Sequence, residues 1–221
     1  MDLIQALAAE LGKDPRHVEN VVHLLDEGNT IPFIARYRKE LHGAMDDTSL
    51  RTLEERLQYL RGLEERREAV KKSIDEQGKL TDELTAAIDS AKTLAEVEDL
   101  YRPYKQKRRT RATMAKEKGL EPLAALLFAQ ERDCPRPEEA ARDFVDPEKG
   151  VETVEDALQG ASDIIAERIS DDAAIRKSLR ALISRQGQLV SRAATEDDSV
   201  YRLYYDFTQS VARLQGHQAV S

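Results

Sequence analysis

The feature that most constrains the fold is a long run of helical spacing from about residue 48 to residue 77. Apolar side chains recur there every three or four residues, opposite a charged side. The apolar positions are Leu50, Leu53, Leu57, Leu60, Leu63, Val70 and Ile74. Only Gly62 interrupts the run, so we predict a helix of about 45 Å. Because Arg67 and Lys71 break the seam of a coiled coil, we expect this helix to pack within its own chain.

Composition points the same way. Aromatic residues are 5% of the 221 residues, Trp is absent, and there are only 10 Gly and 7 Pro. A β-sandwich or barrel needs more turns and more aromatic or β-branched residues. The predicted fold class is therefore all-α: a multi-helix bundle with one long helix around 48–77.

Three short helices precede the long one. Leu3, Leu7 and Leu11 are spaced for a first helix, and Gly12 ends it. Asp14 and Pro15 have the sequence of a helix cap for a second, which Gly28 ends. The third is expected over 30–41. Short helices joined by tight turns are compatible with a helix-turn-helix-like element.

Later helices are expected over 81–88, 93–101, 121–128, 137–145 and 153–187, the last with a possible break at 170–172. Residues 188–221 are less regular, and Leu189-Val190 could be extended. We predict two parts: a helical domain over 1–187, and a tail over 188–221. The tail contains an aromatic cluster, a possible docking surface: Tyr201, Tyr204, Tyr205 and Phe207.

Charge is unevenly distributed. The chain has a net charge of −8, yet residues 102–118 contain eight cations and one acid, Glu117. The rest of the chain has 26 cations and 41 acids. Six cations stand in ten positions, which we call the basic segment: Arg102, Lys105, Lys107, Arg108, Arg109 and Arg111. This segregation is more informative than the total charge.

Like charges packed so closely repel one another unless an anion or an acidic surface faces them. Nucleic-acid phosphate is one candidate, with Tyr101 and Tyr104 as possible stacking planes. The chain's own acidic helices are the other, and the residues alone leave both readings open. A secondary basic patch, Arg36, Arg38 and Lys39, fits a solvated helix end, where cations are favourable.

No other pattern indicates chemistry. Cys134 is the only cysteine, which excludes an internal disulfide framework and a multi-cysteine zinc site. There is no HExxH, glycine-rich phosphate loop or nucleophile elbow. We therefore predict no catalytic residue, metal site or cofactor. The longest apolar run has seven residues, 123–129, and the start lacks a signal pattern, so we expect a soluble, cytoplasmic protein.

Four ordered stretches resemble the N-terminal region of the Tex family of bacterial transcription accessory proteins. They are 29–40 (NTIPFIARYRKE), 73–81 (SIDEQGKLT), 98–113 (EDLYRPYKQKRRTRAT) and 115–123 (AKEKGLEPL). The resemblance covers about Leu3 to Phe207. It implies an all-α region that in the family precedes a YqgF module, helix-hairpin-helix motifs and an S1 RNA-binding domain. Those modules do not fit within 221 residues, so we expect a fragment truncated before the YqgF module.

The resemblance also implies a role in transcription and RNA handling. We therefore expect a non-catalytic helical scaffold whose basic segment contacts RNA or DNA weakly and without sequence preference. The alternative is a structural or protein-docking module that binds a polymerase or a ribonucleoprotein and makes no nucleic-acid contact of its own.

Overall fold

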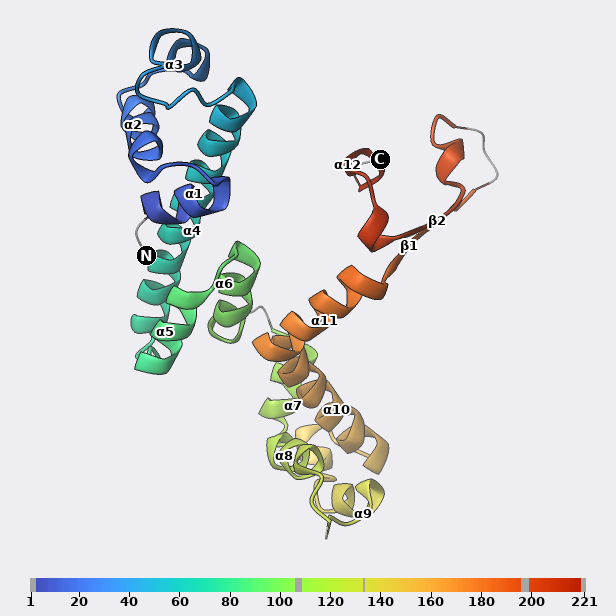
Figure 1. Ribbon diagram of the computed structural model, residues 1–221. Coiled ribbons are helices and arrows are strands. Elements are labelled where there is room, and N and C mark those ends of the chain that lie inside the picture. Colours follow the sequence, from blue (N-terminus) through green and yellow to red (C-terminus); the bar gives the residue numbers. More distant parts are fainter. Residues whose placement is uncertain (1–2, 106–108, 133, 196–198, 220–221) are drawn as a thin grey trace. The chain divides into compact units, whose positions relative to one another are not determined.

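The computed structural model describes residues 3–105, 109–132, 134–195 and 199–219. Lys107 and Arg108 of the basic segment lie outside the described residues. The chain divides into two compact units, residues 1–97 and 98–221, and each is considered by itself. Helices dominate both units, and the described strands form one two-stranded sheet (Figure 1). The all-α prediction is confirmed, while the expected division after residue 187 stays a prediction.

The first unit begins with three short helices and the long one. These are α1 (Leu3–Leu11), α2 (Pro15–Asp26), α3 (Ile31–Tyr37) and α4 (Asp47–Asp75). The predicted caps are present: the Asp14 carboxylate accepts a hydrogen bond from the Arg16 backbone N–H at 2.9 Å. Gly12 and Gly28 end α1 and α2 with φ of +62° and +84°, which only glycine adopts freely.

The core of this unit lies between the short helices and the first half of α4. Its fully buried side chains come from all four helices: Leu7, Val18, Val21, Ile34, Leu50 and Leu53. Burial of a Leu, Ile or Val side chain stabilises by roughly 1.5–3 kcal/mol. The first half of the apolar stripe that the sequence shows over 48–77 is therefore the face of α4 that the short helices cover.

The third helix is shorter than predicted. We expected it to reach Leu41, but α3 ends at Tyr37, because Arg38 leaves the helical region at φ −130° and ψ 36°. The Leu41 carbonyl instead lies 3.0 Å from Nδ1 of His17 and accepts a hydrogen bond from Asn20 at 3.1 Å. These contacts of α2 draw residues 38–44 into a turn.

Two further helices follow the long one: α5 (Asp82–Ser90), and α6 (Leu94–Tyr101), whose residues from Glu98 onward belong to the second unit. Polar contacts tie the chain here to the second half of α4. The Lys71 ammonium contacts the Asp89 carboxylate at 2.9 Å, and the Arg67 guanidinium donates to the Ala91 carbonyl at 2.5 Å. At the start of α6 the Thr93 hydroxyl accepts from the Glu96 backbone N–H at 3.2 Å, and the Glu96 carboxylate accepts from the Lys92 backbone N–H at 2.7 Å.

The second unit is built around one long helix. Its helical elements are η1 (Arg102–Tyr104), α7 (Arg111–Glu117), α8 (Glu121–Ala129), α9 (Pro137–Arg142), η2 (Pro147–Lys149), α10 (Val154–Asp171) and α11 (Ala173–Gln186). Small side chains fill its core around Leu120 and Leu123: Ala112, Ala115, Ala124, Ala140, Ala141, Ala157 and Ala161. Gly160 lets α10 approach closely, because a Cβ there would lie 2.3 Å from Leu120 Cδ1.

The sequence predicts one helix end in this unit correctly and places another too late. The break predicted at 170–172 is confirmed: Asp172 ends α10 and also caps α11, accepting from the Ile175 N–H at 2.8 Å. We expected α9 to reach Val145, but it ends at Arg142. The backbone of Asp146 pairs with that of buried Val151, at 2.9 and 3.0 Å, and this bridge turns the chain away from the helix.

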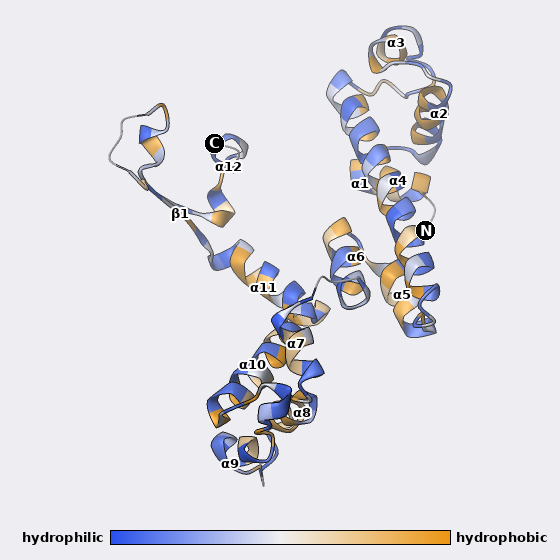
Figure 2. Cartoon of the chain, turned by 180° about the vertical axis from the view of Figure 1, so that it is seen from behind, coloured by the Kyte–Doolittle hydropathy of each residue, from blue (hydrophilic) through white to orange (hydrophobic). Residues whose placement is uncertain are grey.

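The last part of the chain contains a hairpin. Strands β1 (Gln188–Arg192) and β2 (Asp206–Ser210) pair antiparallel, with Gln188 opposite Ser210. The extended structure at Leu189-Val190 was predicted, but β2 was not. The remaining elements are η3 (Arg202–Tyr204), η4 (Val211–Arg213) and α12 (Gly216–Ala219). The α11 helix has no buried side chain, and hydrophobic residues alternate with hydrophilic ones along it (Figure 2).

Candidate nucleic-acid interface

The basic segment lies in the second unit, between α6 and α7. Pro103 ends α6 because its ring has no N–H and clashes with the preceding turn, so η1 follows. At the other end Thr110 caps α7, and its hydroxyl accepts a hydrogen bond from the Thr113 N–H at 3.0 Å. The residues between these two fixed points include the cations that the sequence singles out.

The two ends of the basic segment are bound to acids of the same unit. Arg102 Nε donates to Asp171 Oδ1 at 3.0 Å, and the Asp171 side chain is only 14% exposed. Thr110 Oγ1 donates to Glu167 Oε1 at 3.0 Å. The Arg109 guanidinium pairs with Glu117 at 2.6 Å. For Arg102 and Arg109, the structure therefore supports the reading in which the chain's own acids face the cations.

The other described cations of the segment are different. Lys105 and Arg111 are exposed, and neither has a carboxylate partner among the residues that the structure describes. Lys107 and Arg108 stand between them in the sequence, outside the described residues. The segment is thus anchored at Arg102 and Thr110, with positive charge open to solvent at Lys105 and Arg111.

A buried carboxylate fixes the helix that leads into the segment. Asp99 on α6 is 4% exposed and accepts hydrogen bonds from Arg176 Nε at 2.6 Å and from the Arg180 guanidinium at 2.7 Å. Burial raises the pKa of Asp99, but the hydrogen bonds from the two arginines outweigh burial and hold that pKa below its ordinary value. Both arginines are on α11, so this pair of bonds joins α6 to α11.

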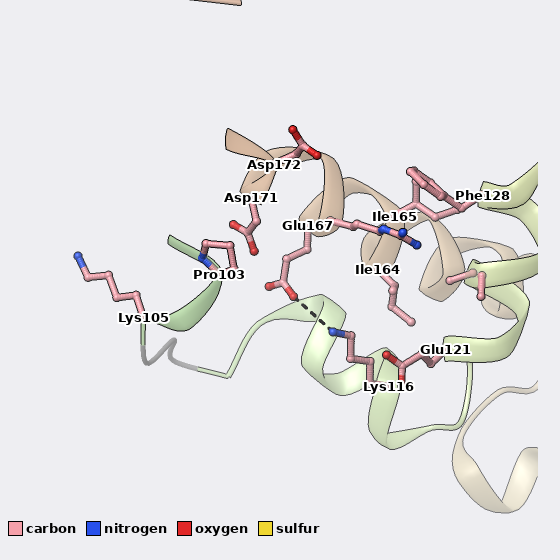
Figure 3. Close-up of a pocket in the computed structure, with 13 residues that line it drawn as sticks. Pro103, Lys105, Lys116, Glu121, Phe128, Ile164, Ile165, Glu167, Asp171 and Asp172 are labelled. Atoms are coloured by element: carbon pink, nitrogen blue, oxygen red, sulfur yellow. Dashed lines mark ion pairs between the residues drawn. The ribbon is translucent and has the colours of Figure 1, made fainter. Parts of the chain in front are cut away.

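A pocket of about 660 Å³ opens beside the basic segment (Figure 3). Pro103 and Lys105 line one end and Phe128 lines the other. Its remaining lining residues come from α7, α8, α10 and the start of α11: Lys116, Glu121, Ala124, Ala125, Ile164, Ile165, Glu167, Arg168, Asp171 and Asp172. In Figure 3 the Lys116 ammonium points toward Glu167, to which it is joined at 3.9 Å.

Most of the acids around this pocket are already engaged. Glu167 accepts from Thr110, Asp171 from Arg102, and Asp172 from the Ile175 backbone. Glu121 is the exception, as an exposed carboxylate with no partner in the described part of the chain. The Arg168 guanidinium lies over the Phe128 ring, 4.1 Å from its centre, where cation and ring attract each other.

The secondary basic patch lies in the first unit. Arg36 is on α3, and Arg38 and Lys39 follow its end, where the helix dipole favours cations. Arg38 also lies over the Phe33 ring, 5.4 Å from its centre. Arg36, Arg38 and Lys39 thus lie at and just after the end of α3, and their role as a basic patch stays a prediction.

The aromatic cluster lies in the second strand of the hairpin and in the residues just before it. Tyr204 and Phe207 pack edge to face with ring centres 5.3 Å apart, and the Tyr205 hydroxyl is hydrogen-bonded to Ser199 at 2.8 Å. Tyr201 is 58% exposed. Of the four predicted docking aromatics, Tyr201 is the one that presents most of its ring to solvent.

A second run of positive charge lies outside the basic segment and was not predicted from the sequence. Residues 173–195 contain five cations and no acid: Arg176, Lys177, Arg180, Arg185 and Arg192. Arg176 and Arg180 are the partners of Asp99. The absence of acids over 173–195 is visible in the sequence. We did not single out this run because its cations are more widely spaced than those of the basic segment.

Within the described ranges, no helix has the length and the hydrophobicity that crossing a membrane requires. In the same ranges, no cluster of three or more histidine, cysteine or acidic side chains is arranged to hold a metal ion. Cys134, the only cysteine of the sequence, is half-buried.

Comparison with known proteins gives the same family as the sequence motifs. Residues 1–75 match the model of the Tex-like protein N-terminal domain, and residues 133–221 match that of the Tex central region. The chain is 48% identical to Protein YhgF of Escherichia coli over 97% of its length. It is 45% identical to Protein tex of Bordetella pertussis over 99%, and 42% identical to the transcriptional accessory protein Tex of Neisseria gonorrhoeae over 100%.

The described part of the chain is a predominantly helical module. The chain belongs to the Tex family, of which it contains the N-terminal and central regions. It spans 28–29% of the length of the three relatives named above.

Proposed function

We propose that the chain is a non-catalytic helical scaffold of a transcription accessory protein, and that its basic segment contacts nucleic-acid phosphates electrostatically. The phosphate-contacting cations are Lys105, Lys107, Arg108 and Arg111. Arg102 and Arg109 chiefly hold the segment against its own unit. Lysines and arginines on phosphates orient a nucleic acid without reading its sequence.

The observation that supports this proposal most is the difference between the residues that hold the segment to its own unit and the cations that have no carboxylate partner in the described part of the chain. Arg102 and Thr110 are bound to α10, while Lys105 and Arg111 have no carboxylate partner among the described residues. Unneutralised cations next to anchored residues lose less conformational freedom on binding an anion than cations on an unanchored chain. The name of the relative from Neisseria gonorrhoeae, a transcriptional accessory protein, agrees with a role near nucleic acid.

A salt series of nucleic-acid binding tests the proposal. Binding that depends on phosphate contacts releases counterions and weakens as salt rises. The test variant replaces Lys105, Lys107, Arg108 and Arg111 by Ala. A matched control removes four exposed cations elsewhere: Lys72, Lys79, Lys92 and Arg213. The test variant should lose affinity and salt dependence with its melting temperature preserved, while the control keeps both.

Protein docking is the second candidate function, and one observation favours it. The α11 helix exposes a stripe of large apolar side chains over 37–55% of their surface: Ile175, Leu179, Leu182 and Ile183. Contiguous apolar surface of this kind is typical of interaction sites. A protein partner that is captured from nuclease-treated extract by the wild-type chain, and not by Leu179→Glu, would support docking.

A further inference from the structure

The pocket beside the basic segment has apolar and acidic lining residues that phosphate contacts do not require. Along α8 its wall follows the spacing of one helix face: Glu121, then Ala124 and Ala125, then Phe128. The two alanines leave the space hollow between a carboxylate and an aromatic ring. Its volume of about 660 Å³ is in the range of small-ligand sites.

Three kinds of chemical group meet in this space. Phe128, which is 37% exposed, offers a flat apolar face, and Ile164 and Ala124 extend that apolar surface. Glu121 offers a carboxylate that can accept two hydrogen bonds and has no partner among the described residues. Lys105 lies at the other end of the pocket, and in Figure 3 its ammonium points away from the pocket, toward the side on which the backbone of a bound strand would lie. A ligand that satisfies all three needs a flat ring, N–H donors on its edge, and an anionic group.

We propose that this pocket binds an unpaired nucleobase of a single-stranded nucleic acid whose backbone lies on the basic segment. The base stacks on Phe128 in place of Arg168, since a separation of 4.1 Å leaves no room for a ring between them. The exposed Arg168 side chain then covers the outer face of the base. Glu121 accepts from the N–H groups of the base edge, which favours guanine because its edge offers two adjacent donors.

The charges around the pocket are compatible with this ligand. Asp171 is paired with Arg102 at 3.0 Å and Glu167 with Lys116 at 3.9 Å, so cations of the chain offset these two carboxylates, while Asp172 accepts from the Ile175 backbone N–H. Lys105 and Arg168 remain as cations near its two ends. The inference rests on the proposed function, because the segment supplies the backbone contacts, but it adds a preference for unpaired bases that phosphate contacts alone do not give.

Binding of short RNA oligonucleotides by fluorescence anisotropy tests the inference. The probes are a guanine-containing single strand, the same strand with abasic sites, a duplex of the same length, and the single strand as DNA. We expect the wild-type chain to bind the single strand about tenfold more tightly than the abasic strand, given the energy of one stacked base. Equal binding of single-stranded RNA and DNA would extend the site to both.

Ala125→Leu is the key variant, because it fills the pocket at an exposed position and removes no existing contact. It should abolish the preference over the abasic strand and leave the salt dependence unchanged. Phe128→Leu should do the same and guards against a folding defect in the first variant. Ala166→Leu, at an exposed position of α10 outside the pocket, is the matched control and should bind as wild type.

The outcomes separate the pocket from the proposed function. Equal affinity of the wild-type chain for the intact and abasic strands overturns the base pocket. An unchanged preference for the intact strand in both Ala125→Leu and Phe128→Leu also overturns it. In either case, binding that still weakens with salt supports the basic segment. Absence of any salt-dependent binding by the wild-type chain overturns both.

Discussion

The carboxylate of Asp99 and the guanidinium of Arg176 meet at 2.6 Å, although 77 residues separate them in the sequence. Asp99 is nearly fully buried, and Arg180 donates to its second oxygen at 2.7 Å. Disrupting a buried carboxylate that has two charged donors costs free energy, because removing the carboxylate charge leaves partly desolvated arginines without a charged partner. This contact joins the helix before the basic segment to α11.

Asp99→Asn should destabilise the protein by about 2 kcal/mol, since the amide loses the charge that both arginines face and the arginine heads stay partly hydrated. Chemical denaturation followed by circular dichroism measures this change. Asp143→Asn, at an exposed carboxylate of the same unit, should change stability by less than about 0.5 kcal/mol. Equal effects of the two substitutions would contradict the role given to Asp99.

The Asp99 carboxylate should make the free energy of unfolding fall at acidic pH. The pKa of Asp99 is lower in the folded protein than in the unfolded chain, so the unfolded chain takes up the proton first as pH falls. Its stabilising contribution is therefore complete at neutral pH and is lost as pH falls below about 4. The stability difference between wild type and Asp99→Asn should shrink over that range, and a constant difference from pH 7 to pH 3 would refute the assignment.

Gly160→Ala should destabilise the second unit by about 1–2 kcal/mol, although alanine favours helices. Its Cβ would lie 2.3 Å from Leu120 Cδ1, and Leu120 is buried in the core with little room to move. Gly62→Ala is the control, since a Cβ in α4 at that position meets open space. It should stabilise by up to about 1 kcal/mol. Thermal melts of the two variants that shift in the same direction would disprove the close approach.

His42→Leu should raise the stability of the first unit by about 1 kcal/mol. The His42 side chain is buried, and neither ring nitrogen has a hydrogen-bond partner among the described residues. A buried polar group without a partner costs desolvation free energy that an apolar side chain of similar size does not. His23→Leu, at an exposed site, should be close to neutral. A destabilised His42→Leu variant would show that His42 has a partner after all.

Arg102→Ala should lower stability by up to about 1 kcal/mol and leave the salt dependence of nucleic-acid binding nearly unchanged. The pair with Asp171 is partly exposed, so its free energy is small. Denaturation and anisotropy on the same preparation distinguish these effects. If the variant instead loses salt dependence with its stability intact, Arg102 contacts phosphate and the division between anchoring and binding cations is wrong.

Local signals in the sequence predicted most helix positions. Asp14 with Pro15, and the acid pair at 171–172, set helix ends through contacts within a few residues, which a sequence displays directly. The ends of α3 and α9 could not be predicted, because contacts from other elements determine them: His17 and Asn20 with the Leu41 carbonyl, and Val151 with Asp146.

The candidate site also contains features set by local sequence, which could be predicted, and features set by distant contacts, which could not. The density of cations at 102–111 was visible in the sequence, but their partners were not, since Arg102 meets Asp171 across 69 residues. The strand β2 was missed because its pairing with β1 closes over a long connection and its residues do not alternate regularly. The pocket was invisible for a similar reason: Glu121 and Phe128 are local to α8, but Ile164 and Arg168 come from α10.

The most direct test of the account is the slope of log affinity for single-stranded nucleic acid against log salt concentration. For the variant with Lys105, Lys107, Arg108 and Arg111 replaced by Ala, we predict a slope shallower by up to about 3, since each phosphate contact contributes about 0.7. The melting temperature should stay within a few degrees of wild type. An unchanged slope together with a lowered melting temperature would contradict the account, because the basic segment would then be structural.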